Sequence, residues 1–150
     1  MKIKFFLTVV FVTLYSAALY AGTAAQDKDF VDKYKAAFEK GDKATLESFL
    51  YTKDANPMAL ELYKMMMTAE AGGKITKIEL VDLTPDDAKK ASEVQTGPDG
   101  SKAKMPLTPT KKLKISIETK DANGSSTSSS ESFVAEKDGK YVIPVPATVK

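Results

Sequence analysis

The fold is decided between residues 56 and 83, which read NPMALELYKMMMTAEAGGKITKIELVDL. The first half has apolar residues at intervals of three and four, as in a helix, with Asn56 as the cap and Pro57 at the first helical position. Gly72-Gly73 ends this helix. From Lys77 onward apolar and polar residues alternate, as in a half-buried strand. A shift of that alternation at Val81 predicts a β-bulge. The chain therefore passes from helix to sheet within this stretch.

The helix in this stretch is apolar over a large part of its circumference. Its apolar residues are Met58, Leu62, Tyr63, Met65, Met66, Met67 and Ala69. A helix with so wide an apolar side needs a large surface to cover it, and a sheet is the natural cover. We therefore expect a curved sheet to lie over this helix.

Two more helices are predicted upstream. Residues 26–40 carry an apolar stripe at helical spacing, made of Phe30, Val31, Tyr34, Ala37 and Phe38. Gly41 ends this helix, and Asp42 caps a shorter one. The buried side of the shorter helix is expected to comprise Leu46, Phe49 and Leu50.

The downstream part begins with a short helix and an irregular segment. Thr84-Pro85 resembles a capped helix start, and the helix should end near Ser92. Residues 96–111 then form an excursion rich in Pro, Gly and Lys, which is long for a loop in a compact domain.

The C-terminal part of the chain is predicted to form strands. Residues 112–118 alternate apolar and polar side chains, and Asp138-Gly139 is a tight turn between strands at 132–137 and 140–145. The Ser-rich segment 121–132, which contains Asn123-Gly124, is interpreted as a flexible hairpin tip. Helices followed by antiparallel hairpins indicate an α+β domain, with N-terminal helices packed on a curved antiparallel sheet.

Residues 1–25 have the features of a signal peptide. Lys2 and Lys4 precede the apolar run Phe5–Leu14, and small residues follow as far as Ala25. A retained membrane anchor is the alternative, but the run is at the short limit for spanning a bilayer. We therefore expect a signal peptide at residues 1–25 and a single domain at 26–150. The exported product would be periplasmic or extracellular and would have no stable membrane anchor.

The composition excludes several kinds of site. The chain contains no His, Cys, Trp or Arg. Zinc, copper and haem sites of the usual kind are therefore excluded, as are Ser-His-Asp and Cys-His catalysis, and no cofactor or metal is expected. Two of the 22 Lys lie in the leader, so the rest of the chain carries equal numbers of Lys and acidic residues. A protein without net charge has no field that attracts nucleic acid, and none is expected as a partner.

Two stretches resemble the nuclear transport factor 2-like superfamily of cystatin-like α+β cones. They are residues 34–46, YKAAFEKGDKATL, and residues 133–143, FVAEKDGKYVI. The first is similar to the family's first helix, which ends in Gly-Asp before a second helix. The second is similar to the closing hairpin of many exported members, where Trp often stands in place of Tyr141. The resemblance implies the fold, but the superfamily includes isomerases, dehydratases, ligand binders and interaction modules, so it does not select a function.

One apolar and two charged groups of side chains are candidate sites. Met65-Met66-Met67 with Tyr34 and Tyr63 could line an adaptable pocket, although ordinary core is the simpler interpretation. A lysine group could contact an anionic surface, or it could be a solvated loop and strand: Lys102, Lys104, Lys111, Lys112 and Lys114. An acidic group could hold a hard cation, although capping and solvation are simpler roles: Glu79, Asp82, Asp86 and Asp87.

The function expected from the sequence is binding. The leading hypothesis is an exported, non-enzymatic domain of the cell envelope. It would bind an unknown small molecule or an envelope protein in the cleft between helix and sheet, and a homodimer is also possible. The alternative is a small lyase or isomerase that uses a buried carboxylate and a Tyr in the cone. An acidic side chain deep in an open cone beside a Tyr hydroxyl would favour the enzyme.

Overall fold

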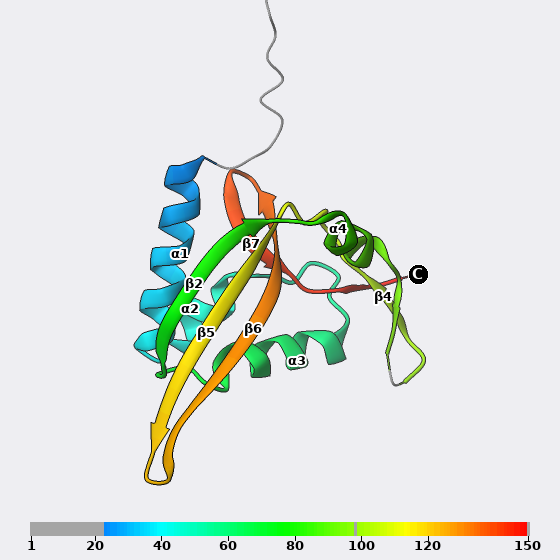
Figure 1. The fold of residues 1–150 in the computed structure, drawn as a ribbon. Helices are drawn as coiled ribbons and strands as arrows, with labels where there is room; N and C mark the ends of the chain where they lie inside the picture. The colour runs from blue at the N-terminus through cyan, green and yellow to red at the C-terminus, as the bar shows by residue number, and fades with distance from the viewer. Residues whose placement is uncertain (1–22, 98, 150) are drawn as a thin grey trace, which may run out of the picture.

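The fold is α+β, as predicted, with helices packed on a curved sheet (Figure 1). The computed structural model describes residues 23–97 and 99–149. Residues 1–22 fall outside this part, so most of the expected leader at 1–25 lies outside the described residues. The arrangement is compatible with a cone of the kind that the resemblance implies.

The helices of the described residues are α1 (Ala24–Glu39), α2 (Lys43–Ser48), α3 (Pro57–Thr68) and α4 (Pro85–Ser92). Three of the four begin at the predicted caps, Asp42, Asn56 and Thr84, whereas α1 is capped by Thr23 and begins two residues before the predicted start at 26. Thr23 and Gln26 form a capping box at the start of α1, and Thr84 and Asp87 form another at the start of α4. Gly41, at φ 66°, turns the chain from α1 into α2.

Five strands form the main sheet in the order β1-β7-β6-β5-β2. They are β1 (Leu50–Tyr51), β2 (Lys74–Asp82), β5 (Lys111–Asp121), β6 (Gly124–Lys137) and β7 (Lys140–Pro144). All neighbours are antiparallel except β1, which pairs parallel with β7. Asp138-Gly139 forms the expected tight turn, with both residues at positive φ. The bulge in β2 lies between Ile75 and Lys77, which is earlier than the alternation predicted.

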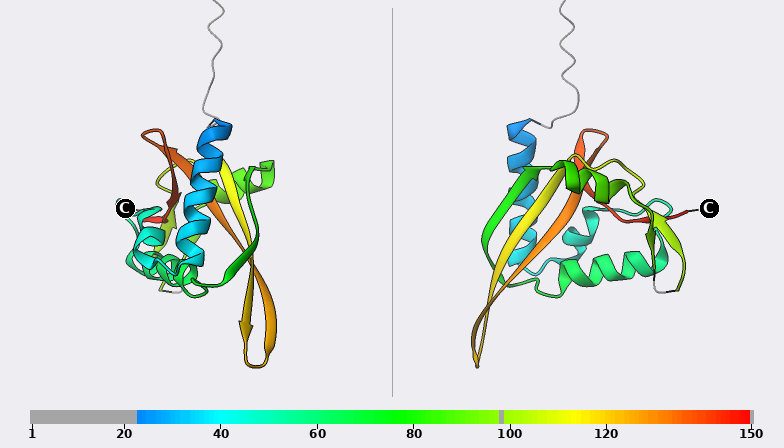
Figure 2. Two further views of the ribbon diagram at one scale, coloured as in Figure 1. Left: turned by 90° about the vertical axis from the view of Figure 1, so that its left-hand side faces the viewer. Right: turned by 45° about the vertical axis from the view of Figure 1, so that its right-hand side comes forward.

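The excursion at 96–111 contains strands of its own. A second sheet has the order β3-β4-β8, with β3 (Gln95–Thr96), β4 (Lys102–Lys104) and β8 (Ala147–Thr148). The C-terminal strand β8 pairs with β4 and so ties this segment to the body of the domain. The segment is therefore a small lobe beside the main sheet rather than a loop (Figure 2).

The Ser-rich segment is paired as a strand over most of its length and only residues 122–123 form the turn, which corrects the prediction that the whole of 121–132 is a hairpin tip. β5 and β6 pair without interruption from Lys111 opposite Val134 to Asp121 opposite Gly124. Within this ribbon the hydroxyls of Thr119 and Ser126 are hydrogen-bonded at 2.7 Å. The ribbon extends beyond the rest of the sheet as an arm, which both views show (Figures 1 and 2).

The core lies between the sheet and the first two helices. Its aromatic residues come mainly from α1, and its aliphatic residues come from α2, β2, β5, β6 and β7; they include Phe30, Tyr34, Phe38, Leu46, Ile75, Leu113, Ile115, Ile117, Val134 and Ile143. Met67 is the buried residue of α3. The expectation that the sheet covers the wide apolar side of α3 is therefore wrong, because side chains of α1 and α2 already fill the core face of the sheet.

Candidate binding surface

The helix α3 is held at both of its ends. Asn56 Oδ1 accepts hydrogen bonds from the backbone N–H groups of Met58 (3.0 Å) and Ala59 (3.1 Å). Asn56 Nδ2 donates to Ser101 Oγ at 3.3 Å, which ties the start of α3 to the small lobe. Beyond the other end, the N–H of Gly72 donates to the carbonyl of Phe38 at 2.7 Å. The helix is thus fixed in place although little of it enters the core.

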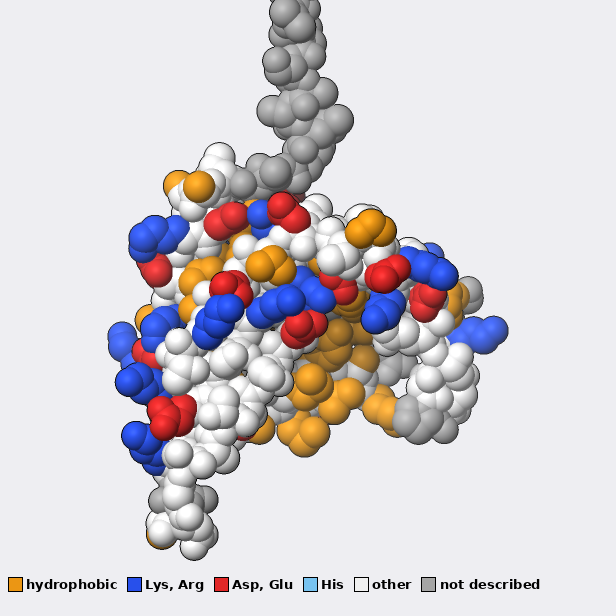
Figure 3. All heavy atoms as spheres, in the orientation of Figure 1, with side chains coloured by type: hydrophobic (Ala, Val, Ile, Leu, Met, Phe, Trp, Pro, Cys, Tyr) orange, Lys and Arg blue, Asp and Glu red, His pale blue; other side chains and the backbone are white. Residues whose placement is uncertain are grey.

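The outward side of α3 carries four large apolar side chains, which we call the methionine face. They are Met58, Leu62, Met65 and Met66, between 47% and 61% exposed, whereas Met67 is only 6% exposed. Figure 3 shows hydrophobic side chains gathered in a hollow between β6 and the part of the chain that carries α4 and β4. Exposed large apolar side chains that gather on one surface mark an interaction site far more often than scattered ones do.

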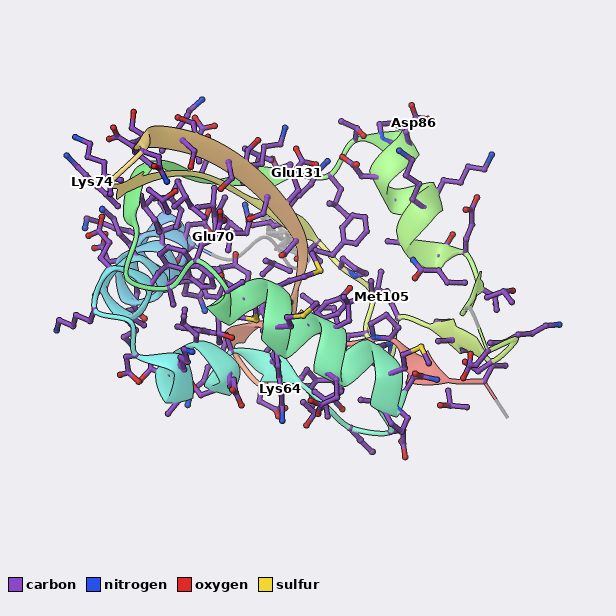
Figure 4. All side chains as sticks on the ribbon, turned by 90° about the horizontal axis from the view of Figure 1, so that it is seen from below. Lys64, Glu70, Lys74, Asp86, Met105 and Glu131 are labelled. Carbon is purple, nitrogen blue, oxygen red and sulfur yellow. The ribbon has the colours of Figure 1, made fainter. Side chains whose placement is uncertain are left out.

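A cavity of about 220 Å³ adjoins the methionine face, between α3 and the small lobe. Its walls are mostly apolar, with amide and hydroxyl side chains of the lobe at one side: Asn56, Met58, Ala59, Leu62, Tyr63, Gln95, Thr96, Gly97, Ser101, Ala103 and Pro146. Burial raises the pKa of the Tyr63 hydroxyl, so it stays neutral. Seen from below in Figure 4, α3 lies in front, with Met105 beyond it toward α4. Among the described residues, the walls of the cavity therefore offer apolar contacts and hydrogen-bonding groups but no charged side chain.

The predicted group of methionines and tyrosines is divided by the structure. Tyr34 and Met67 are buried in the core, and burial raises the pKa of Tyr34 to about 12. Met65 and Met66 lie on the methionine face instead of in the core. The sequence shows that all these residues are apolar but not which side of α3 meets another element, so the exposed pair could not be distinguished from the buried residue.

The predicted lysine group does not form one surface. Lys111 is 7% exposed, with its Nζ 3.0 Å from Asp82 Oδ1 and 3.2 Å from Asp27 Oδ2. Desolvation alone would lower the pKa of Lys111, but the hydrogen bonds to Asp82 and Asp27 outweigh it and raise the pKa. Lys112 Nζ lies 2.7 Å from Asp87 Oδ1. These two lysines are ion-paired and largely buried, so neither the anionic-surface interpretation nor the solvated one describes them.

The predicted acidic group is likewise engaged in pairs. Hydrogen bonds from Lys112 and then from Thr84 lower the pKa of Asp87 to about 2. Glu79 is ion-paired with Lys77 at 2.9 Å. Within the described part of the chain, no three acidic side chains come together as a metal site would require. Capping accounts for Asp87, as the simpler interpretation proposed, but this side chain is buried and ion-paired with Lys112 rather than solvated.

A tyrosine–carboxylate pair of the kind that the enzyme hypothesis needs occurs at the start of α1. Tyr141 Oη donates to Asp27 Oδ1 at 2.7 Å, and the other oxygen of Asp27 faces Lys111. The start of α1 and the whole of α3 lie at opposite ends of the domain (Figure 1). This pair is therefore separate from the methionine face and its cavity.

Comparisons with family models, with curated proteins and with solved structures find no match to this chain. Within the described residues, no helix combines the length and the apolar character that a membrane crossing requires. The methionine face is consequently interpreted from its own geometry.

Proposed function

We propose that the protein is a non-enzymatic binding domain of the cell envelope, and that it binds through the methionine face and the adjoining cavity. The observation that carries the proposal is the placement of four large apolar side chains on the solvent side of a helix fixed at both ends. Removing apolar area from water contributes roughly 25 cal/mol per Å². A partner that covers these side chains would gain that free energy without any rearrangement of the helix.

Methionine suits such a surface. Its unbranched, polarizable side chain adapts to partners of different shape, and three of the four residues of the face are Met. The hydroxyl and amide groups at the side of the cavity, from Gln95, Thr96 and Ser101, would orient a bound group.

The alternative enzyme is less well supported. Its carboxylate would have to lie in an apolar cavity beside a Tyr hydroxyl, where burial raises the pKa of the acid. The described residues that line the cavity beside α3 include Tyr63 but neither Asp nor Glu. Asp27 does have a Tyr beside it, but the ammonium group of Lys111 pairs with this carboxylate.

Membership of the nuclear transport factor 2-like superfamily and export from the cytoplasm are parts of the same proposal. The helix–helix–sheet order and the two stretches at 34–46 and 133–143 support the superfamily. The order of charged, apolar and small residues within segment 1–25 supports export.

Native mass spectrometry of protein purified from the envelope of its own cells tests this proposal. We expect a chain that has lost its leader and carries a non-covalent addition, either a small molecule or a second polypeptide. The variant Leu62→Lys should lose that addition because it places a charge in the middle of the methionine face. The variant Asp32→Lys, on the exposed side of α1, is the control. A bare chain in the wild type, or an addition that Leu62→Lys retains, would overturn the proposal.

A further inference from the structure

The strand β6 has no neighbouring strand on one side along most of its length. β5 pairs with β6 from Gly124 to Val134, whereas β7 pairs with it only from Ala135 to Lys137. Among the described residues, no strand therefore lies beside residues 124–134 of β6 on the side away from β5.

The two hairpin turns determine which main-chain groups of β6 face this side. A two-residue turn is closed by a pair of residues that exchange both of their main-chain hydrogen bonds. Lys137 and Lys140 close the turn to β7, and Asp121 and Gly124 close the turn to β5. Because the bonding direction alternates along a strand, the N–H and C=O groups of the odd-numbered residues from 125 to 133 point away from β5. We call this row of groups the open edge of β6.

The open edge lacks the features by which proteins usually protect the edge of a sheet. Such edges are short, bulged, or lined with charged residues and proline. β2, an outer strand of the same sheet, has a bulge after Ile75 and four charged residues, Lys74, Lys77, Glu79 and Asp82. Residues 125–133 of β6, SSTSSSESF, contain one charged residue and pair with β5 without a bulge. β6 is therefore suited to pairing with a further strand.

The open edge lies beside the methionine face. Ser128 Oγ donates to the carboxylate of Glu70 at 2.8 Å, so β6 passes close to the end of α3. The first turns of α3 extend on the open side of β6 toward the small lobe (Figure 4). Hydrophobic side chains fill the hollow there (Figure 3). A strand added to β6 would continue the sheet across this hollow, and every second side chain of that strand would face α3.

We infer that β6 binds an extended segment of another protein as an additional strand, and that alternate side chains of this segment cover the methionine face. This inference rests on the proposed function, because it names the partner of the same surface. The segment would pair through its main chain with the open edge. Its side chains that face α3 should be apolar, because a charged group against the methionine face would lose its water without gaining a partner.

A second copy of the chain is poorly suited to this place. Its matching open edge would be its own β6, and apart from Phe133 the residues from 125 to 133 are all Ser, Thr or Glu. Whichever side of that strand faced α3, it would bring polar side chains to the methionine face. The exposed apolar side chains of α3 therefore favour a different polypeptide, in which apolar residues alternate with others.

Hydrogen exchange of single amides, followed by nuclear magnetic resonance, tests the inference with a peptide as the probe. The peptide has six residues, alternating Thr and Val, with both ends blocked. In the free protein, β5 protects the N–H groups of Ser128, Ser130 and Ser132, whereas those of Ser129 and Glu131 should exchange rapidly. The peptide should protect Ser129 and Glu131 as well. A control peptide of alternating Thr and Ser should bind at least tenfold more weakly, because it has nothing apolar to place on α3.

Two substitutions at Ser129 separate main-chain pairing from side-chain contact. Ser129→Pro removes an N–H of the open edge and leaves the hydrogen bonds with β5, which belong to the even-numbered residues. It should weaken binding of the Thr-Val peptide about tenfold. Ser129→Ala keeps the N–H and should bind the peptide as the wild type does. Protection of the even-numbered amides shows that each variant is folded.

The outcomes separate this inference from the proposed function. A peptide that leaves Ser129 and Glu131 unprotected, or a folded Ser129→Pro that binds as well as Ser129→Ala, would overturn the inference. So would protection of these amides by high protein concentration alone, which would identify a second copy. Should native mass spectrometry find an addition that Leu62→Lys removes, while the peptide protects neither amide, the binding function would stand and the added strand would fall.

Discussion

The helices α1 and α3 have similar apolar patterns but opposite surroundings. α1 lies against the sheet beside β2 and β7, and its Phe30, Tyr34 and Phe38 are all buried. α3 contacts α2 and buries Met67, while the methionine face stays in contact with solvent. Under the proposed function, the two helices have different tasks: α1 stabilises the domain, and α3 presents the surface that binds a partner.

Truncation of an apolar side chain on each helix gives the largest contrast. Phe38 is 2% exposed and Met66 is 57% exposed. We expect Phe38→Ala to lower the free energy of unfolding by about 3–5 kcal/mol, because it leaves a cavity in the core. Met66→Ala should change it by only about 0.5 kcal/mol or less. Urea unfolding of the monomer at low concentration measures both, and equal losses would contradict the division of tasks.

The polar contact at the end of α1 predicts a smaller effect that depends on pH. Glu39 is ion-paired with Lys35 and accepts a hydrogen bond from the N–H of Ile75 at 3.1 Å. The hydrogen bond from Lys35, followed by that from Ile75, holds the pKa of Glu39 below its ordinary value of 4.5. The folded state thus favours the ionised form, so this contribution is complete above pH 4.5 and is lost as the pH falls below it.

The variant Glu39→Gln isolates that contribution. It keeps an oxygen that can accept from Ile75 but has no carboxyl group to titrate. The free energy of unfolding of the wild type should therefore fall more steeply between pH 5 and pH 3 than that of the variant. Identical slopes in acid titrations of the two proteins would show that Glu39 does not anchor α1.

Oxidation of the three consecutive methionines should have the smallest effect on stability of the changes considered, and it should distinguish exposed from buried side chains. Met65 and Met66 are exposed, whereas Met67 is buried. With dilute hydrogen peroxide and monomeric protein, Met65 and Met66 should become sulfoxides before Met67, and the fold should survive. Peptide mass spectrometry follows each residue. Equal rates for all three would contradict the difference in exposure between Met67 and its two neighbours, and unfolding at the first oxidation would show that Met65 or Met66 supports the core.

The contrast between α1 and α3 also shows what the sequence predicts and what it does not. The spacing of Phe30, Tyr34 and Phe38 predicts a helix and its buried side, because the rest of the chain supplies a sheet for it to cover. The spacing at Met58, Leu62 and Met65 predicts a helix equally well. Periodicity indicates which side of a helix is apolar, but it does not indicate whether another element of the fold covers that side.

The strands show the same limit of local reasoning, because pairing with a distant part of the chain can make a strand of a sequence that does not indicate one. Residues such as Ser125 and Ser129 are typical of turns and loops, and local reasoning therefore interprets the segment as a loop. Their pairing with β5 overrides that preference. The small lobe around β4 could not be foreseen because its partner β8 lies far along the chain, beyond the whole of the β5–β6 ribbon and β7. For the same reason the ion pair of Lys112 with Asp87, on separate elements, could not be derived from spacing.

The arm formed by β5 and β6 has a consequence for how the domain comes apart. Ser128 donates to both oxygens of Glu70 at 2.8 Å, and beyond that anchor residues 122–127 are all exposed. A two-stranded ribbon without a covering layer is only marginally stable in water. The tip therefore opens and closes at a free energy far below that of global unfolding. A protease would cut first at this tip and leave the remaining domain intact, and an inserted label would be tolerated at the same place.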